Sequence, residues 1–160
     1  MILTRIDYCN SLLYGTSDSN KKRLQKIQSR TARVVLRSGR RASSIAVLSK
    51  LHWLPVEQRI IHKIGSITYT AMTQKQPKYL ADMLNKESHA RSHRSNEQNK
   101  LHVPRRRIEA SRSSFTHSAP EVWNSISSYC KGSEDRPTFC KRLKTELFTS
   151  SLSSSATLGH

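Results

Sequence analysis

The chain has 160 residues, which suits one domain, and 28 lysines and arginines against 11 acids give it a formal net charge of +17. Apolar residues make up 35% and aromatic residues 6%, so the core is expected to be modest and mostly aliphatic. No stretch approaches the ~20 apolar residues of a membrane-spanning helix, and Arg5, Asp7 and Asn10 interrupt the apolar pattern that a signal peptide needs. We therefore expect a nuclear or cytoplasmic protein that is neither secreted nor membrane-bound and has an anionic partner, nucleic acid before membrane.

The first predicted region, residues 1–84, consists of helices joined by short connections. Apolar residues at steps of 4, 3 and 4 mark one face of a first helix over residues 2–14: Ile2, Ile6, Cys9 and Leu13. A second helix, over roughly 19–38, follows the capping residues SDSN. Its apolar residues share one side and are expected to face the core: Leu24, Ile27, Thr31, Val34 and Val35.

The opposite side of this second helix is basic. At about 100° per residue, its cations fall within an arc of about 100°: Lys22, Arg23, Lys26, Arg30, Arg33 and Arg37. No acid occurs between Asp18 and Glu57, although ten lysines and arginines do. A solvated helix face usually mixes signs and gains i,i+4 pairs, whereas this one gains repulsion. The pattern favours contacts with backbone phosphates over a plain solvated face, and Arg40 and Arg41 just beyond the helix are further candidates.

The stretch LHWLPVEQRI, residues 51–60, is predicted to connect two helices. Ser43 or Ser44 can cap a short helix that runs to about residue 51, and Pro55 suits the first turn of the next helix. The apolar residues of that next helix follow one face: Val56, Ile60, Ile64, Ile67 and Ala71. Trp53 or Leu54 is expected to pack against it as a staple, and a Trp53 that stacks on a base is the alternative. Residues 77–84 predict a further turn or two.

The remainder is predicted as three segments. Residues 85–113 form a polar, basic linker, extended in part, in which Arg105, Arg106 and Arg107 are candidate phosphate contacts and His89 and His93 are loop residues, not metal ligands. Residues 114–148 form C-terminal helices, one broken around a proline and a last one that starts at Pro137. Residues 149–160, rich in serine, form a disordered tail. The predicted fold class is all-α: a small helical bundle with an irregular, partly extended middle segment and a disordered tail.

No catalytic centre is evident in the sequence. Phosphoryl transfer with two metal ions needs converging carboxylates, and the only adjacent acids, Glu134 and Asp135, follow Gly132 in a predicted loop. A glycine-rich phosphate loop and a GxSxG elbow are both missing. Three widely spaced cysteines are expected to be reduced thiols: Cys9, Cys130 and Cys140. We expect no cofactor, no bound metal and no small-molecule substrate.

Seven stretches, in this order, carry a resemblance to a known family: RIDYCNSLLYG (5–15), LQKIQSRTARVVLR (24–37), LHWLPVEQRI (51–60), PKYLADML (77–84), VPRRR (103–107), SAPEVWNSI (118–126) and FCKRLKTELF (139–148). The chain resembles the carboxy-terminal part, the thumb and the region behind it, of a non-LTR (LINE-type) retrotransposon reverse transcriptase. The chicken-repeat and jockey-like groups are the most similar. The resemblance covers about residues 2–148, with residues 1–84 as the thumb-like region.

The resemblance implies a helical region that holds a template–primer duplex by its backbone. The family's catalytic aspartates and its endonuclease belong to segments upstream of this one, so no catalytic residue is carried over. The implied function is that of a detached C-terminal fragment of an RNA-directed DNA polymerase, itself no enzyme. Such a fragment would bind RNA, DNA or hybrid backbone without sequence specificity, and the rest of a reverse transcriptase is a further partner. A non-functional truncated gene product and an accessory part acting in trans are the alternatives.

Overall fold

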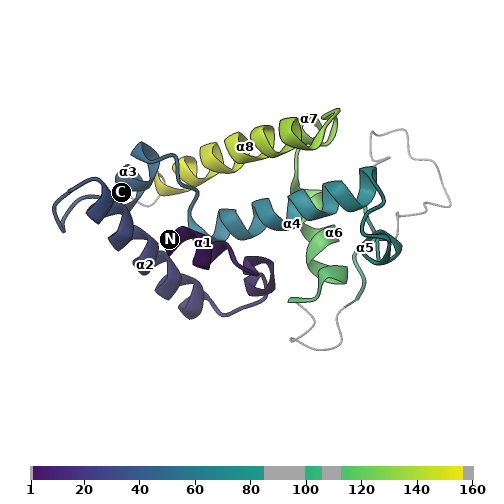
Figure 1. The fold of residues 1–160 in the computed structure, drawn as a ribbon, viewed down its shortest axis with the longest axis horizontal. Coiled ribbons are helices and arrows are strands. Elements are labelled where there is room, and N and C mark those ends of the chain that lie inside the picture. The colour runs from purple at the N-terminus through teal and green to yellow at the C-terminus, as the bar shows by residue number, and fades with distance from the viewer. Residues whose placement is uncertain (1, 85–99, 106–112, 157–160) are drawn as a thin grey trace.

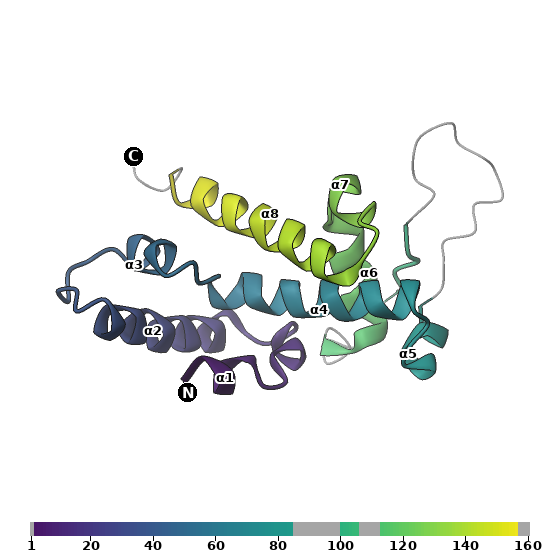
Figure 2. The ribbon, with the colours of Figure 1, turned by 45° about the horizontal axis from the view of Figure 1, so that its top comes forward.

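Residues 2–84, 100–105 and 113–156 are described by the structure, a computed structural model, and the regular elements along them are helices. The predicted all-α class is therefore confirmed. Helix α4 (Val56–Thr73) runs through the middle of the molecule. On one side lies α8 (Arg136–Ala156), and on the other lie α1 (Ile2–Asp7) and α2 (Asp18–Val35) (Figure 2).

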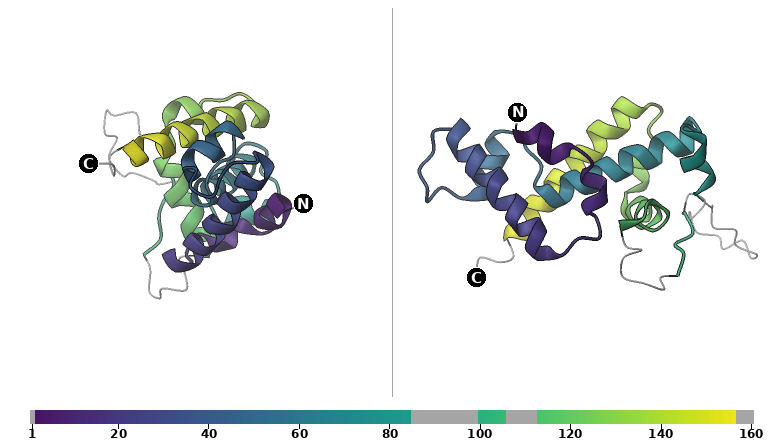
Figure 3. Two further views of the ribbon diagram at one scale, coloured as in Figure 1. Left: turned by 90° about the vertical axis from the view of Figure 1, so that its left-hand side faces the viewer. Right: turned by 60° about the horizontal axis from the view of Figure 1, so that its bottom comes forward.

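The shorter helices are found at the two ends of α4. The 3₁₀ helix η1 (Asn10–Leu13) and α3 (Ser44–Lys50) belong to the N-terminal part of the chain. Helices α5 (Lys78–Asp82) and α6 (Phe115–Ser125) lie at the end of the molecule opposite α3, and α7 (Ser128–Lys131) joins α6 to α8 (Figures 1 and 3). The sequence predicted each of these helices except α7, whose four residues are too few to show a period.

The main core is apolar and lies where α4, α6 and α8 meet. Helix α4 contributes Val56, Ile60 and Ile64, which belong to its predicted apolar face. The other two helices contribute further buried residues: Ala119, Val122 and Trp123 from α6, and Phe139 and Leu143 from α8. The rings of Tyr69 and Phe139 stack with their centroids 4.3 Å apart. Helix α4 approaches its neighbours closely at Gly65, where an added Cβ would lie 2.9 Å from Leu143 Cδ2 and 3.1 Å from Ile126 Cδ1.

Helix α2 forms where it was predicted, and Leu24 of its predicted inner side packs against the main core, but three of the five residues of that side are exposed. Ile27 is 46% exposed, Val34 77% and Val35 55%. The buried residues of α2 are instead Gln28, Ser29 and Ala32. The side of α2 that faces the molecule meets two kinds of surface. Ala32 packs on Val47 and Leu48 of α3, whereas the amide of Gln28 meets polar backbone just before α4, which an amide matches better than an aliphatic side chain does.

Two glutamines make this polar contact, and we call the pair Gln25 and Gln28 the glutamine clasp. Gln28 Nε2 donates to the Leu54 carbonyl at 2.8 Å, and Gln25 Oε1 accepts from the Val56 backbone N–H at 2.8 Å. The two amides also bond to each other, from Gln25 Nε2 to Gln28 Oε1 at 3.1 Å. The clasp thus satisfies backbone groups on both sides of Pro55 in the connection between α3 and α4.

Trp53 in this connection packs against a second, smaller cluster. Ala32, Val47 and Leu48 form the cluster, with Trp53 at its edge, so this tryptophan packs on α2 and α3. Of the two residues expected to pack on the following helix, Trp53 packs on the preceding ones instead, and Leu54 is buried with 5% of its surface exposed. The chain leaves α3 in a Schellman turn, in which the Trp53 N–H donates to the Leu48 carbonyl at 2.9 Å.

Three predicted boundaries differ from the structure. The first helix ends at Asp7, which pairs with Arg59 of α4, and Cys9 follows with a left-handed φ of 51°. A break was predicted around Pro120, but α6 continues through this buried proline. Buried core residues on both sides of Pro120 hold the helix together. The disordered tail was predicted to start at residue 149, but α8 continues to Ala156, because adding residues to an existing helix is favourable once it has formed.

Several predictions concern residues beyond those described. Residues 85–99 and 106–112, which hold most of the predicted linker with His89, His93, Arg106 and Arg107, lie outside the described residues, as do residues 157–160. The described part of the linker, residues 100–105, is irregular. Within the described ranges, no helix combines the length and the apolar character that crossing a membrane requires.

Candidate nucleic-acid interface

The basic surface of α2 projects away from the rest of the molecule. Four of its cations are exposed: Lys22, Arg23, Lys26 and Arg30. Among the residues that the structure describes, none of these four takes part in an ion pair. Lys21, one residue before this row, faces α4 instead, where its Nζ lies 3.3 Å from Glu57 Oε1. The glutamine clasp and this ion pair together fix which side of α2 faces outward.

A groove continues the basic surface at the C-terminal end of α2. It has a volume of about 690 Å³, and four arginines line it: Arg30, Arg33, Arg37 and Arg40. The C-terminal end of a helix carries a partial negative charge. Part of this positive charge therefore stabilises α2 itself, and the rest is available to an anionic partner.

Arg33 has a structural role that the sequence did not reveal. Its Nε and Nη2 donate to the Ala42 carbonyl at 3.1 and 3.0 Å, and Nη2 also reaches Ser44 Oγ at 2.9 Å. The guanidinium therefore ties α2 to the loop before α3. Because its position is fixed by three bonds, Arg33 presents a rigid cation to the groove.

Arg37 lies past the end of α2 and not on the predicted arc. Its φ of 51° is left-handed, and the Ser38 N–H donates to the Arg33 carbonyl at 2.9 Å, as in a Schellman motif. A glycine usually occupies this position, and its absence hid the helix end in the sequence. The turn directs Arg37 into the groove.

The remaining candidates are not brought together with α2. Arg41 is exposed in the loop after α2 but does not line the groove. Arg105 follows Leu101, whose backbone N–H and carbonyl bond to the amide of Asn124 at 2.9 and 2.8 Å. The segment of residues 100–105, coloured between two grey traces in Figure 1, thus lies near α5 and α6, at the other end of the molecule from α2.

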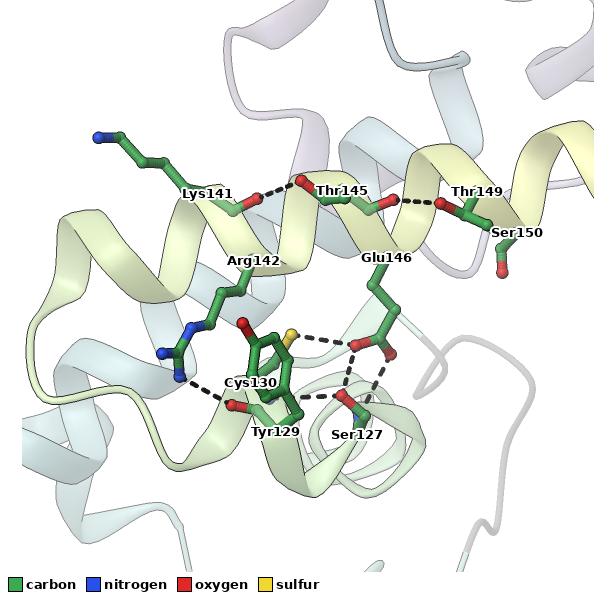
Figure 4. Close-up of a pocket in the computed structure, with 9 residues that line it drawn as sticks. All are labelled: Ser127, Tyr129, Cys130, Lys141, Arg142, Thr145, Glu146, Thr149 and Ser150. Carbon is green, nitrogen blue, oxygen red and sulfur yellow. Dashed lines mark hydrogen bonds between the residues drawn. The ribbon is translucent and has the colours of Figure 1, made fainter.

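A second hollow, which the sequence did not indicate, lies between α7 and α8 (Figure 4). Its volume is about 890 Å³. Glu146 of α8 accepts hydrogen bonds there from the Ser127 N–H at 3.2 Å, from Ser127 Oγ and from Cys130 Sγ at 3.0 Å. At its rim, the Arg142 guanidinium lies over the Tyr129 ring, 4.3 Å from the ring centroid. These contacts join the α7 region to α8, so no local sequence pattern predicts them.

The protonation states in this hollow favour a structural tie over nucleophilic chemistry. Burial, together with the bond to Glu146, raises the pKa of the Cys130 thiol to about 11. Burial also opposes ionisation of Glu146, but the hydrogen bonds from Cys130 and Ser127 outweigh it and lower the pKa of this carboxyl. At neutral pH the thiol is therefore a protonated donor, and thiolate, not thiol, is the reactive form. Glu146 caps α7 and fastens it to α8.

No protein-family model matches the chain, and neither the curated proteins nor the solved structures give a match. Among the described residues, no group of three or more histidines, cysteines and acids is placed to hold a metal ion.

Proposed function

We propose that this chain binds the backbone of nucleic acid without sequence specificity, through the exposed cations of α2 and the arginine groove at its end. The observation that carries the proposal is a row of exposed cations with no acidic partner among the described residues, continuous with a groove lined by further arginines. Phosphates are the partners that relieve such repulsion, and contacts to phosphates carry no sequence information.

The dimensions of the row suit a nucleic-acid strand. Between Lys22 and Arg30 the helix rises about 12 Å at ~1.5 Å per residue. A duplex carries roughly one charge per 1.7 Å of its axis. The row therefore meets several phosphates at once, and the groove beyond Arg30 extends the contact.

The family resemblance supports the same partner. On this proposal the chain is a detached carboxy-terminal fragment of a retrotransposon RNA-directed DNA polymerase, and its ligand is the backbone of a template–primer duplex. The fragment holds the duplex and contributes no catalytic residue. The seven ordered stretches support the proposal that the chain is a retrotransposon fragment, and the charge of α2 supports the more general proposal that it binds a nucleic-acid backbone.

Fluorescence anisotropy with a labelled RNA–DNA hybrid tests the proposal. In the test variant, four cations of the surface are replaced: Lys22→Gln, Lys26→Gln, Arg30→Gln and Arg37→Gln. In the matched control, four exposed lysines elsewhere are replaced: Lys50→Gln, Lys75→Gln, Lys78→Gln and Lys141→Gln. Both variants lose the same charge, so a difference between them reports position. Two hybrids of unrelated sequence are compared to measure specificity.

With about four phosphate contacts, the affinity of the unmodified chain should fall roughly 100-fold between ~50 and ~200 mM salt. The α2 variant should lose most of this affinity and its salt dependence, while the control should retain both. The two hybrid sequences should bind alike. Equal losses in the two variants would show that net charge alone drives binding, and unchanged binding by the α2 variant would place the site elsewhere; either result overturns the proposal.

A further inference from the structure

A cleft of about 510 Å³ lies on the side of α4 where η1, the α3–α4 connection and the first half of α8 meet. This volume is in the range of sites that bind small organic ligands. Helices α4 and α8 lie one above the other in Figure 2 and separate toward the α3 end of the molecule. Residues from distant parts of the chain thus share one concave surface that is separate from the cations of α2.

The cleft carries an excess of positive charge. Lys63, Arg136 and Lys144 line it, are exposed, and take part in no ion pair among the described residues. The only carboxylate in its lining is Asp7, which Arg59 neutralises through two bonds, one of them from Nε to Oδ1 at 2.7 Å. Four cations and one carboxylate leave three positive charges around one hollow.

Neutral acceptors lie in the wall beside these cations. His62 Nε2 lies 3.2 Å from the Cys140 carbonyl, so it donates there, since a carbonyl only accepts. Burial, with Lys144 and Arg59 nearby, lowers the pKa of His62, so the ring is neutral at pH 7 and its Nδ1 is an acceptor. The buried Asn10 donates from Nδ2 to Asp7 Oδ1 at 3.4 Å, and its Oδ1 has no hydrogen-bond partner among the described residues.

Trp53 adds an aromatic ring to the same cleft. The ring is half-buried, because its other side packs on the small cluster of α2 and α3. A ligand that matches the cleft therefore needs negative charge, N–H or O–H donors, and a flat face. Inorganic phosphate lacks the flat face, and so does an acidic peptide without aromatic residues. A nucleotide supplies all three, since bases stack on aromatic side chains and phosphates pair with cations.

We propose that this cleft binds a nucleotide, with its phosphate at Lys63, Arg136 and Lys144 and its base or sugar toward Trp53, Asn10 and His62. A free nucleotide and the phosphorylated end of a strand share this chemistry. The site does not rest on the function proposed for α2, because none of the α2 cations lines the cleft.

The two tryptophans provide the measurement. Trp53 lines the cleft, while Trp123 is buried in the main core with 4% of its surface exposed. Adenosine 5′-monophosphate is titrated into ¹⁵N-labelled chain, and both indole N–H resonances are followed by NMR, with Trp53→Phe giving the assignment. Adenosine, inorganic phosphate and a 5′-phosphorylated oligonucleotide are titrated in parallel.

The nucleotide should shift the Trp53 resonance and leave that of Trp123 in place. Adenosine and phosphate should each bind at least tenfold more weakly. The variant Lys63→Gln with Lys144→Gln should weaken nucleotide binding at least tenfold without lowering Tm, because both side chains are exposed. The control, Lys26→Gln with Arg30→Gln, should bind the nucleotide as the unmodified chain does.

Binding of the oligonucleotide alone, lost in the Lys63 and Lys144 variant, supports the site and identifies a strand end as its ligand. The proposal is overturned by any of three results: no shift of Trp53 with either nucleotide probe, adenosine or phosphate binding as tightly as the nucleotide, or undiminished binding in the variant. None of these results changes the anisotropy that is expected when the α2 variants are mixed with the RNA–DNA hybrid. Failure of this site is therefore distinguishable from failure of the function proposed for α2.

Discussion

The two layers on either side of α4 are held to it by different chemistry. Toward α6 and α8 the contact is apolar and close, with Gly65, Leu143 and Ile126 at the point of nearest approach. Toward α2 it is partly polar: Leu24 packs against the main core, but the glutamine clasp meets backbone groups of the α3–α4 connection. The apolar layer supplies most of the buried surface that stabilises a fold. The polar layer fixes orientation, and with it the direction in which the cations of α2 point.

The largest expected effect is in the apolar layer. Phe139→Ala removes a fully buried ring that stacks on Tyr69, and it should lower the free energy of unfolding by about 3–5 kcal/mol, from lost burial and the cavity left behind. Chemical denaturation monitored by circular dichroism measures this. Phe148→Ala, at a half-buried position further along α8, is the control and should cost clearly less. Equal losses would mean that the core is not centred where α4, α6 and α8 meet.

An intermediate effect is expected in the polar layer. Gln28→Leu leaves the Leu54 carbonyl without its donor in a buried place, which should cost about 1–3 kcal/mol of unfolding free energy. Gln25→Leu likewise removes the acceptor of the Val56 N–H. Because the amides also bond to each other, the double variant should lose less than the sum of the two. Additive losses in denaturation experiments would show that the two glutamines act separately.

The smallest effect is expected on the exposed apolar residues of α2. Val34→Ala should change the free energy of unfolding by no more than about 0.5 kcal/mol, because this side chain is 77% exposed. Ala32→Leu, on the buried side, is the contrasting variant and should cost about 1–3 kcal/mol through overpacking. The opposite ranking in thermal or chemical unfolding would restore the orientation that the apolar pattern of α2 predicts.

The sequence predicted helix positions well and α2 orientation badly, for one physical reason. Apolar periodicity reports which side of a helix is buried only where its neighbours are apolar, as for Ile60 and Ile64 of α4. The buried residues of α2 are Gln28, Ser29 and Ala32, and because two of these three are polar, an apolar pattern does not find this side. The side of the exposed cations Lys26 and Arg30 could still be predicted, since charge seeks solvent whichever residues are buried.

The details of the candidate sites needed three-dimensional contacts. Arg33 bonds to the loop before α3, and Arg37 adopts a left-handed turn that usually takes glycine, so neither role follows from helical spacing. The cleft beside α4 joins Asp7, Lys63 and Lys144, which are separated by most of the chain and share no motif. Sequence alone shows that the chain is rich in cations, but it does not show which of them share this cleft.

The close contact at Gly65 has a consequence for the making of the protein. Helix α4 leaves the ribosome long before α8, which must cover it, because the whole of residues 74–135 lies between them. At about 5–20 residues per second this interval lasts for several seconds. During that time Leu143 of α8 is missing from the apolar face around Gly65, and this glycine in the middle of α4 weakens the isolated helix. Part of this apolar face should therefore stay exposed in the nascent chain until α8 has been synthesised.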